Sequence, residues 1–178
     1  TGILGKLIPE FTGIIDKIQY NHYHLFPVDK HSIRCVQILN HFRKPAESRL
    51  SAFYSSVFKD VRNKNLLLFT ALLHDIGKSV PEQEHSKSGT KIARPILERF
   101  GFSLPEIRDA VFLIENHLLL IQIATRRDIS DEETAIYMAK KVVKLRLLRM
   151  LFLLTVADSQ ATGPKAWNEW TANLLKDL

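Results

Sequence analysis

Residues 69–78 read Phe69-Thr70-Ala71-Leu72-Leu73-His74-Asp75-Ile76-Gly77-Lys78, an apolar segment that ends in an adjacent histidine and aspartate. Residues 66–73 are apolar at nearly every position, which is typical of a helix buried on all sides. Gly77 tolerates the left-handed conformation that often stops a helix, so we expect His74 and Asp75 where a buried helix ends. A carboxylate in apolar surroundings costs several kcal/mol unless it is compensated, and the negative end of a helix adds to that cost. A bound metal ion would compensate it.

Four further residues share this unusual setting. His31 is expected on a helix with apolar residues at three-residue spacing, His85 opens the next helical stretch, and His117 lies on an apolar face. Asp158 ends the apolar run 150–157, and it repeats the electrostatic problem described above. A lone histidine of this kind is usually a hydrogen-bonded core residue, and an aspartate can simply orient its neighbour. Four such histidines and two such aspartates together favour a metal site.

The order His31, then His74-Asp75, then Asp158 resembles the HD superfamily of metal-dependent phosphohydrolases, an all-α fold named after its adjacent histidine and aspartate. The segments "VDKHSIR", "RNKNLLLFTALLHDIGK", "ENHLL", "RRDISD" and "LLTVADSQATGPKAWNEWTANLLKDL" further resemble the HD domain of the bifunctional uridylyltransferase/uridylyl-removing enzymes. These enzymes control the nitrogen-signalling PII protein. The resemblance covers almost the whole chain. The opening "TGILGKLIPEF" resembles the segment that leads into this domain from a preceding nucleotidyltransferase domain.

This resemblance implies a divalent metal centre. In two-metal members of the HD superfamily, the ligands would correspond to His31, His74, Asp75, His85, His117 and Asp158, with Asp75 bridging the ions. Single-metal members need no counterpart of His85 and His117. We expect one or two ions, most readily Mn²⁺ or Mg²⁺ with Fe or Zn as alternatives, because imidazole and carboxylate suit such ions, whereas the lack of a cysteine set argues against structural zinc. Two ions about 3.5–4 Å apart would activate water for in-line attack on phosphorus.

Three basic residues are candidates for contact with a phosphate. Lys78 lies about one helical turn after His74 and could neutralise phosphoryl charge or protonate the leaving oxygen. It could equally cap the carbonyl groups at that helix end. We expect Asp75 and Lys78 to be the catalytic residues. Arg126 and Arg127 lie in a short connection and could bind a substrate phosphate or a protein partner, or form an ordinary surface pair.

The function expected from these residues and the resemblance is metal-dependent phosphodiester hydrolysis, namely removal of UMP from a uridylylated PII protein. Residues 79–84 read Ser-Val-Pro-Glu-Gln-Glu where that family has a glycine-rich stretch, so a stiffer, more acidic loop could alter substrate fit. Two alternatives remain open. One is hydrolysis of a free nucleotide or cyclic dinucleotide, and the other is a non-catalytic module that binds metal or nucleotide and signals to a neighbouring transferase domain.

Composition favours a single helical domain over residues 1–178 in the cytoplasm. The chain is 46% hydrophobic, which is enough for a sizeable core. Cys35 is the only cysteine, so no internal disulfide can form, and we expect a buried, reduced thiol. No signal-like start is present, and the longest apolar run is about eight residues, far below the roughly 20 of a membrane span. The start at Thr1 suggests a piece of a larger multidomain enzyme.

Charge does not point to nucleic acid. Lys and Arg total 25 against 19 Asp and Glu, a net charge of +6 that can attract phosphates or have no functional meaning. The densest basic run, residues 140–149, has leucines threaded through it, which favours the solvated side of an amphipathic helix. It contains no aromatic residue for base stacking. The resemblance implies a PII-type protein as the partner, and these residues do not favour nucleic acid or a membrane.

Apolar residues at three- and four-residue spacing predict an all-α fold without strands or internal repeats. Helices are predicted at residues 11–18, 33–42, 50–58, 65–75, 85–100, 106–121, 131–142, 144–158 and 166–178. Proline and glycine residues fall between most of these segments. Pro95 is the exception, and it is predicted to kink or divide its helix.

Overall fold

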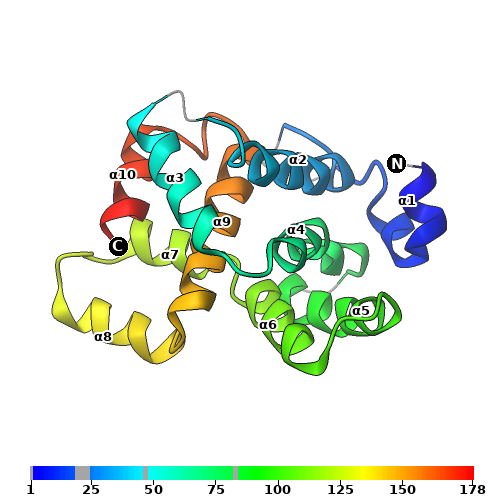
Figure 1. The fold of residues 1–178 in the computed structure, drawn as a ribbon. Coiled ribbons are helices and arrows are strands. Elements are labelled where there is room, and N and C mark those ends of the chain that lie inside the picture. Colours follow the sequence, from blue (N-terminus) through cyan, green and yellow to red (C-terminus); the bar gives the residue numbers. More distant parts are fainter. Residues whose placement is uncertain (1, 19–24, 46–47, 82–83) are drawn as a thin grey trace.

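The computed structural model describes residues 2–18, 25–45, 48–81 and 84–178, and this part of the chain contains helices and no strand (Figure 1). The elements are α1 (Gly2–Leu7), η1 (Pro9–Ile14), α2 (Val28–His41), α3 (Arg49–Asp60), α4 (Lys64–Leu73), η2 (Ile76–Ser79), α5 (His85–Arg99), α6 (Leu104–Glu115), α7 (Leu119–Arg126), α8 (Glu132–Lys141), α9 (Leu145–Thr162) and α10 (Glu169–Asp177), where η marks a 3-10 helix. The all-α fold class is therefore confirmed.

Helices that are far apart in the sequence form the centre of the fold. α2 packs against α9, and α4 packs against α2, α6 and α9. α5 and α6 lie together on one side of α4, while α3 and α10 lie toward the opposite end near the C-terminus (Figure 1). Leu39, Leu67, Leu113 and Leu154, from four different helices, are fully buried in one hydrophobic cluster. The described helices thus share a single core.

The end of α4 lies where the sequence predicts it. Asn63 begins the helix, because its side chain accepts a hydrogen bond from the backbone N–H of Leu66. The helix ends at Leu73, and the chain turns through His74 and Asp75 into η2. The left-handed role predicted for Gly77 is wrong, since positive φ among the described glycines occurs only at residues 101 and 163.

Gly77 is instead needed for close packing between η2 and α5. A Cβ at this position would lie 1.9 Å from the carbonyl oxygen of His85 and 2.4 Å from the backbone nitrogen of Gly89. Both neighbours are backbone atoms, so neither can move aside as a flexible side chain would. The missing side chain therefore lets the segment after Asp75 lie directly against the first turn of α5, which carries His85.

The helix predicted at residues 106–121 is two helices, and His117 lies in the break between them. Asn116 caps α6, and its side-chain amide donates to the carbonyl of Phe112 at 2.8 Å. The Nδ1 atom of His117 pairs with the carbonyl of Ile114 at 2.7 Å. The Phe112 carbonyl also accepts from the backbone N–H of Asn116, as in a continuous helix, whereas the Ile114 carbonyl pairs with the imidazole of His117. This contact explains why apolar spacing alone did not reveal the break.

Three other boundaries also differ from the predictions. Asp158 does not end its helix, because α9 continues to Thr162 and stops at Gly163, where φ is 135°. The segment predicted at 11–18 forms only the short η1. Within η1, Gly13 packs closely on η2, since a Cβ on Gly13 would lie 2.7 Å from the Cβ of Ser79. The final helix begins only after Asn168, whose side chain accepts from the N–H of Thr171. α5 runs unbroken through the proline at position 95.

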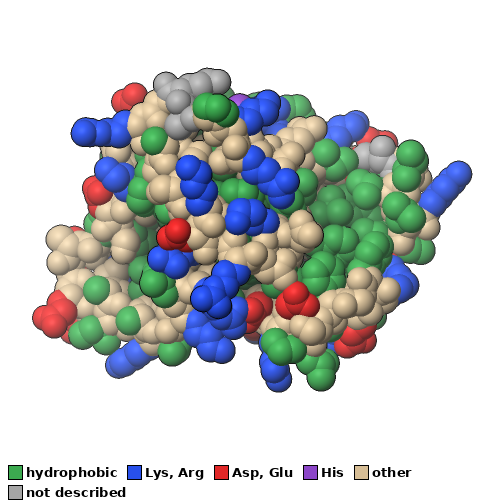
Figure 2. Space-filling view, viewed as in Figure 1, with side chains coloured by type: hydrophobic (Ala, Val, Ile, Leu, Met, Phe, Trp, Pro, Cys, Tyr) green, Lys and Arg blue, Asp and Glu red, His purple; other side chains and the backbone are tan. Residues whose placement is uncertain are grey.

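Several charged residues on the surface form ion pairs. Figure 2 shows Lys and Arg side chains beside Asp and Glu side chains on one face, with a hydrophobic area at the right of the view. Within the basic run 140–149, Arg146 pairs with Asp109 of α6, and Arg149 pairs with Asp60 of α3 at 3.2 Å. Among the described residues, no helix has both the length and the apolar character needed to cross a membrane.

We predict that Gly77→Ala lowers the free energy of unfolding by about 3 kcal/mol, because the added methyl group collides with two backbone atoms. Chemical denaturation followed by circular dichroism measures the change. Gly2→Ala is the matched control, since nothing lies within 4 Å of its added Cβ. The free energy of unfolding of the control should equal that of the unchanged protein or exceed it by up to about 1 kcal/mol. Equal stability of the two variants would contradict the close packing of η2 on α5.

Candidate metal centre

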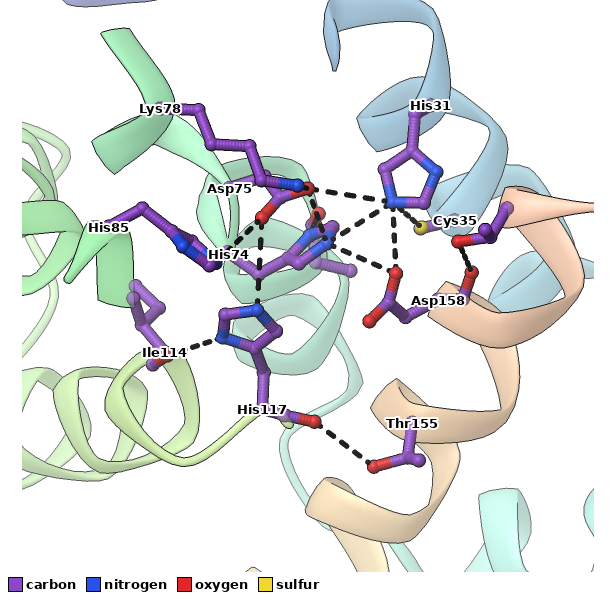
Figure 3. Close-up of polar contacts among 12 residues, drawn as sticks. His31, Cys35, His74, Asp75, Lys78, His85, Ile114, His117, Thr155 and Asp158 are labelled. Atoms are coloured by element: carbon purple, nitrogen blue, oxygen red, sulfur yellow. Dashed lines mark hydrogen bonds and ion pairs between the residues drawn. The ribbon is translucent and has the colours of Figure 1, made fainter. Parts of the chain in front are cut away.

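All six predicted ligand residues lie together in the structure (Figure 3). His31 comes from the first turn of α2, and His85 is the first residue of α5. His74 and Asp75 follow α4, His117 lies between α6 and α7, and Asp158 lies on the last turns of α9. Five separate segments therefore supply the side chains, and most of these side chains lie at or near a helix end.

The inner group of donor atoms consists of the side chains of His31, His74 and Asp158. The Nε2 atom of His31 lies 3.4 Å from Nε2 of His74 and 3.0 Å from Oδ1 of Asp158. The remaining separation, from His74 Nε2 to Asp158 Oδ1, is 3.6 Å. Donors bound 2.0–2.3 Å from a tetrahedral ion lie about 3.3–3.8 Å from one another. Two of the three separations fall in this range, and the third, 3.0 Å between His31 and Asp158, is slightly shorter.

The outer group consists of His85, His117 and the Oδ1 atom of Asp75. Oδ1 lies 3.6 Å from Nε2 of His85 and 3.7 Å from Nε2 of His117. The other carboxylate oxygen, Oδ2, faces the inner group, at 3.5 Å from Nε2 of His74 and 3.7 Å from Nε2 of His31. Asp75 therefore stands between the two groups, with one oxygen toward each.

Backbone contacts orient two of the imidazole rings toward the cluster. Nδ1 of His74 lies 2.8 Å from the carbonyl of Ala71, and Nδ1 of His117 makes the equivalent contact with Ile114. A carbonyl only accepts hydrogen bonds, so Nδ1 carries the proton in each ring. In a neutral ring the Nε2 lone pair is then directed at the cluster. Such second contacts are typical of histidines that bind metals.

The buried charges of the cluster strongly perturb its ionisation. Burial opposes ionisation of Asp75, but His74, Lys78 and His117 outweigh it and hold the carboxyl pKa well below its usual range. Burial also acts against the charged form of His74, yet Asp75 and Asp158 raise its pKa to about 9. For His117, burial and the neighbouring His74 lower the pKa to about 4. Neutral His117 can coordinate an ion at once, whereas His74 must first release a proton.

The donor set fits a divalent cation. Asp75 is 2% exposed, and within the described residues neither its Oδ1 atom nor Nε2 of His85 has a hydrogen-bond partner. Buried polar atoms are seldom left without partners, and an ion between them would satisfy both. Imidazole nitrogens with carboxylate oxygens are the ligands of Zn²⁺, Fe²⁺ and Mn²⁺ sites. The residues present therefore match the metal that the sequence predicts.

Lys78 lies at the edge of the cluster. Its Nζ atom contacts Oδ2 of Asp75 at 2.5 Å, and its side chain is 12% exposed. The ammonium group thus lies on the carboxylate that joins the two donor groups. In this position it already neutralises part of the buried negative charge. Both roles predicted for it in catalysis remain predictions.

A cavity of about 630 Å³ opens beside the outer group. Asp75, Lys78, His85, His117 and Asp158 form part of its wall, so the cluster lies at its inner end. The helix that follows His117 supplies Gln122 and Arg126, and the segment after α9 supplies Lys165 and Trp170. The volume lies in the usual range for small-molecule sites.

The structure separates the two arginines that the sequence places together. Arg126 lines the cavity, whereas Arg127 stacks its guanidinium group on Tyr137 at 4.3 Å. Only Arg126 is therefore positioned to meet a ligand in the cavity. The acidic loop predicted to alter substrate fit lies partly outside the described residues, at positions 82 and 83.

Sequence reasoning missed several residues of this site. Lys165 and Trp170 line the cavity, but they lie in a segment without helical periodicity or at the start of a short helix. Cys35 is fully buried as expected, yet its Sγ atom also lies 3.6 Å from Nε2 of His31. The four-residue spacing of these two residues on one helix was the available signal.

An all-α fold with histidines and aspartates clustered at its helix ends is typical of metal-dependent hydrolases. The family model of the HD domain matches residues 28–154, which is more than half of the chain, and the protein belongs to this family. HD domains are typically metal-dependent hydrolases. The matched segment contains five of the six predicted ligands, while Asp158 lies four residues beyond its end.

We predict that protein purified without chelator contains a divalent ion, and that the double change His74→Ala/Asp75→Ala abolishes its binding. Elemental analysis measures the ion. The double change should destabilise less than an ordinary core truncation, because it removes a buried charge together with its neighbour. A protein that takes up no divalent ion even from excess would contradict the metal centre.

We further predict that His85→Ala and His117→Ala each lower the bound metal toward one ion per chain. The inner group keeps His31, His74 and Asp158 in both variants, so one ion should remain. Two ions per chain in both variants would show that the outer histidines are ordinary core or surface residues. Equilibrium dialysis with Mn²⁺ and Zn²⁺ measures the stoichiometry.

Proposed function

We propose that this protein is a metal-dependent phosphodiesterase that releases UMP from a uridylylated tyrosine of a PII-type signalling protein. The observation that carries the proposal is the position of Asp75, which faces two groups of metal-ligand type at the inner end of a basic cavity. Membership of the HD domain family supports the hydrolytic class. The named substrate rests on the sequence resemblance described above.

His31, His74, Asp75, His85, His117 and Asp158 would hold the ions. Bound divalent ions would lower the pKa of water to near neutrality and polarise a phosphoryl oxygen. The chain's own residues then have to position the substrate, and the cavity suits this task. Its wall carries three cationic side chains, Lys78, Arg126 and Lys165, which can bind a phosphodiester anion.

Trp170 provides a surface for the nucleobase. Its side chain lines the cavity and is 62% exposed, which is unusual for a large aromatic residue. Stacking of a base on an aromatic ring contributes about 1–3 kcal/mol. Gln122, supplied by α7, also lines the cavity, and its amide can donate to or accept from a base edge. A nucleotidyl group thus has partners for both its phosphate and its base.

The leaving group makes the reaction compatible with this site. In the proposed reaction, water attacks phosphorus, the bond from phosphorus to the tyrosyl oxygen breaks, and the phenolate leaves with both electrons and takes up a proton. A phenol has a pKa of about 10, so phenolate departs more readily than an alkoxide. The site therefore needs charge neutralisation more than a strong general acid. Lys78 is the residue placed to supply it, as its ammonium lies beside Asp75.

We predict that the metal-loaded protein hydrolyses aryl phosphodiesters in the presence of Mn²⁺, releases UMP from uridylylated PII protein, and leaves phosphomonoesters mostly untouched. Chromatographic detection of UMP measures the second reaction. Turnover of free nucleotides or cyclic dinucleotides without UMP release from the modified protein would instead support a hydrolase of free nucleotides. A fully metal-loaded protein that hydrolyses no phosphoester would support a non-catalytic module that binds metal or nucleotide.

Two substitutions test how the cavity residues contribute. Lys78→Ala should lower kcat about 10-fold or more while metal content changes little, because the lysine neutralises phosphoryl charge and is not a metal ligand. Arg126→Ala should raise KM about 10-fold through loss of one phosphate contact, and Arg127→Ala is its matched control, since that side chain stacks on Tyr137. Equal effects of the two arginine substitutions would contradict the assignment of the cavity as the substrate site.

A further inference from the structure

Cys35 lies within the inner group of donor atoms. It follows His31 by one helical turn on α2, and its Sγ atom is 3.6 Å from Nε2 of His31. The thiol is fully buried. Sγ, the two Nε2 atoms of His31 and His74, and a carboxylate oxygen of Asp158 all lie within 4.8 Å of one another. A sulfur ligand at about 2.3 Å and a nitrogen ligand at about 2.0 Å from one tetrahedral ion are separated by about 3.5 Å.

Asp75 shares its carboxylate between the two groups and with Lys78. Its Oδ2 atom, which faces that group, is engaged by the ammonium of Lys78 at 2.5 Å. Its Oδ1 atom, buried and without a hydrogen-bond partner among the described residues, faces His85 and His117. The carboxylate thus offers its unsatisfied oxygen to the outer group. Besides Oδ2 of Asp75, the inner group has two nitrogens and one oxygen, and the sulfur of Cys35 lies beside them.

We propose that the metal centre is asymmetric, with Cys35 as an additional ligand of a closed inner site and with the outer site open to the cavity. The inner site would include His31, Cys35, His74 and Asp158, and the outer site His85 and His117, with Asp75 between the two sites. This inference rests on the metal dependence included in the proposed function. It adds Cys35 to the ligand set implied by the resemblance.

The surroundings of the two sites agree with this division. The cavity wall includes all three outer residues, but of the four inner residues it includes only Asp158. Four protein ligands without access for water are typical of a structural site, whereas three ligands and an open position are typical of a catalytic one. Thiolate favours Zn²⁺, Co²⁺ or Fe²⁺ over Mg²⁺ and Mn²⁺. The inner site should therefore select thiophilic ions, and harder ions can exchange at the outer site.

Binding of the ion at Cys35 forms a bond between Sγ and the metal and transfers the thiol proton to solvent. No electron is transferred, so no oxidant or reductant is required. Because Cys35 is the only cysteine in the chain, any thiolate–metal signal reports on this residue alone.

Cobalt reconstitution tests the assignment. Protein stripped of metal under reducing conditions is titrated anaerobically with Co²⁺, and bound cobalt is counted by elemental analysis. We expect the first equivalent to produce a near-ultraviolet thiolate-to-cobalt charge-transfer band. Cys35→Val fills a similar apolar volume and should lose the band while its far-ultraviolet circular dichroism is retained. Cys35→Ser should also lose the band but keep an oxygen ligand.

His85→Ala is the matched control, because it changes the outer site and should retain the band with one cobalt ion bound. Bound cobalt without the band in the unchanged protein would overturn the role of Cys35 and leave the proposed function standing. A band that persists in Cys35→Val would overturn it too, since the signal could not come from a thiolate. No cobalt binding in the unchanged protein would overturn both this inference and the metal dependence of the proposed function.

Discussion

The buried carboxylate of Asp75 is the constraint on which the site depends. An isolated charge in this position would cost several kcal/mol, and the end of α4 adds its negative dipole. The fold compensates by bringing the imidazoles of four histidines and the ammonium of Lys78 around one carboxylate (Figure 3). Each of these groups lies within 3.7 Å of a carboxylate oxygen, where a positive charge favours the ionised carboxylate. The surrounding helices hold these groups in place through their shared hydrophobic core.

The ligands lie mostly at helix ends because a helix interior offers few directions for a side chain. At an end, the backbone can turn a residue toward a point that several helices share. The close approach of η2 to α5 at Gly77 places His85 opposite Asp75, and the break after α6 turns His117 inward. The missing side chain at Gly77 and the pairing of His117 with the Ile114 carbonyl therefore position ligands of the same site.

The sequence predicted the fold class, the end of α4 and the six residues that meet in the cluster. This was possible because an adjacent histidine and aspartate directly after an apolar helix are polar residues where buried apolar ones are expected. Such an exception can be seen in the sequence alone. The break at His117 could not be seen, since it depends on the contact between its imidazole and the carbonyl of Ile114, which periodicity does not report. The difference between Arg126 and Arg127 likewise depends on where Tyr137 lies.

Lys78 links the stability of the site to its proposed chemistry. Without an ion, its ammonium and the proton on His74 offset part of the negative charge of Asp75 and Asp158. This reduces the repulsion between the two carboxylates. An ion between the same donors would supply that compensation and would weaken the attraction that holds the ammonium to Oδ2. The ammonium, at the wall of the cavity, would then be available to an anionic ligand there. One side chain could thus serve as counter-ion to the cluster and, in the proposed function, as cation for the substrate.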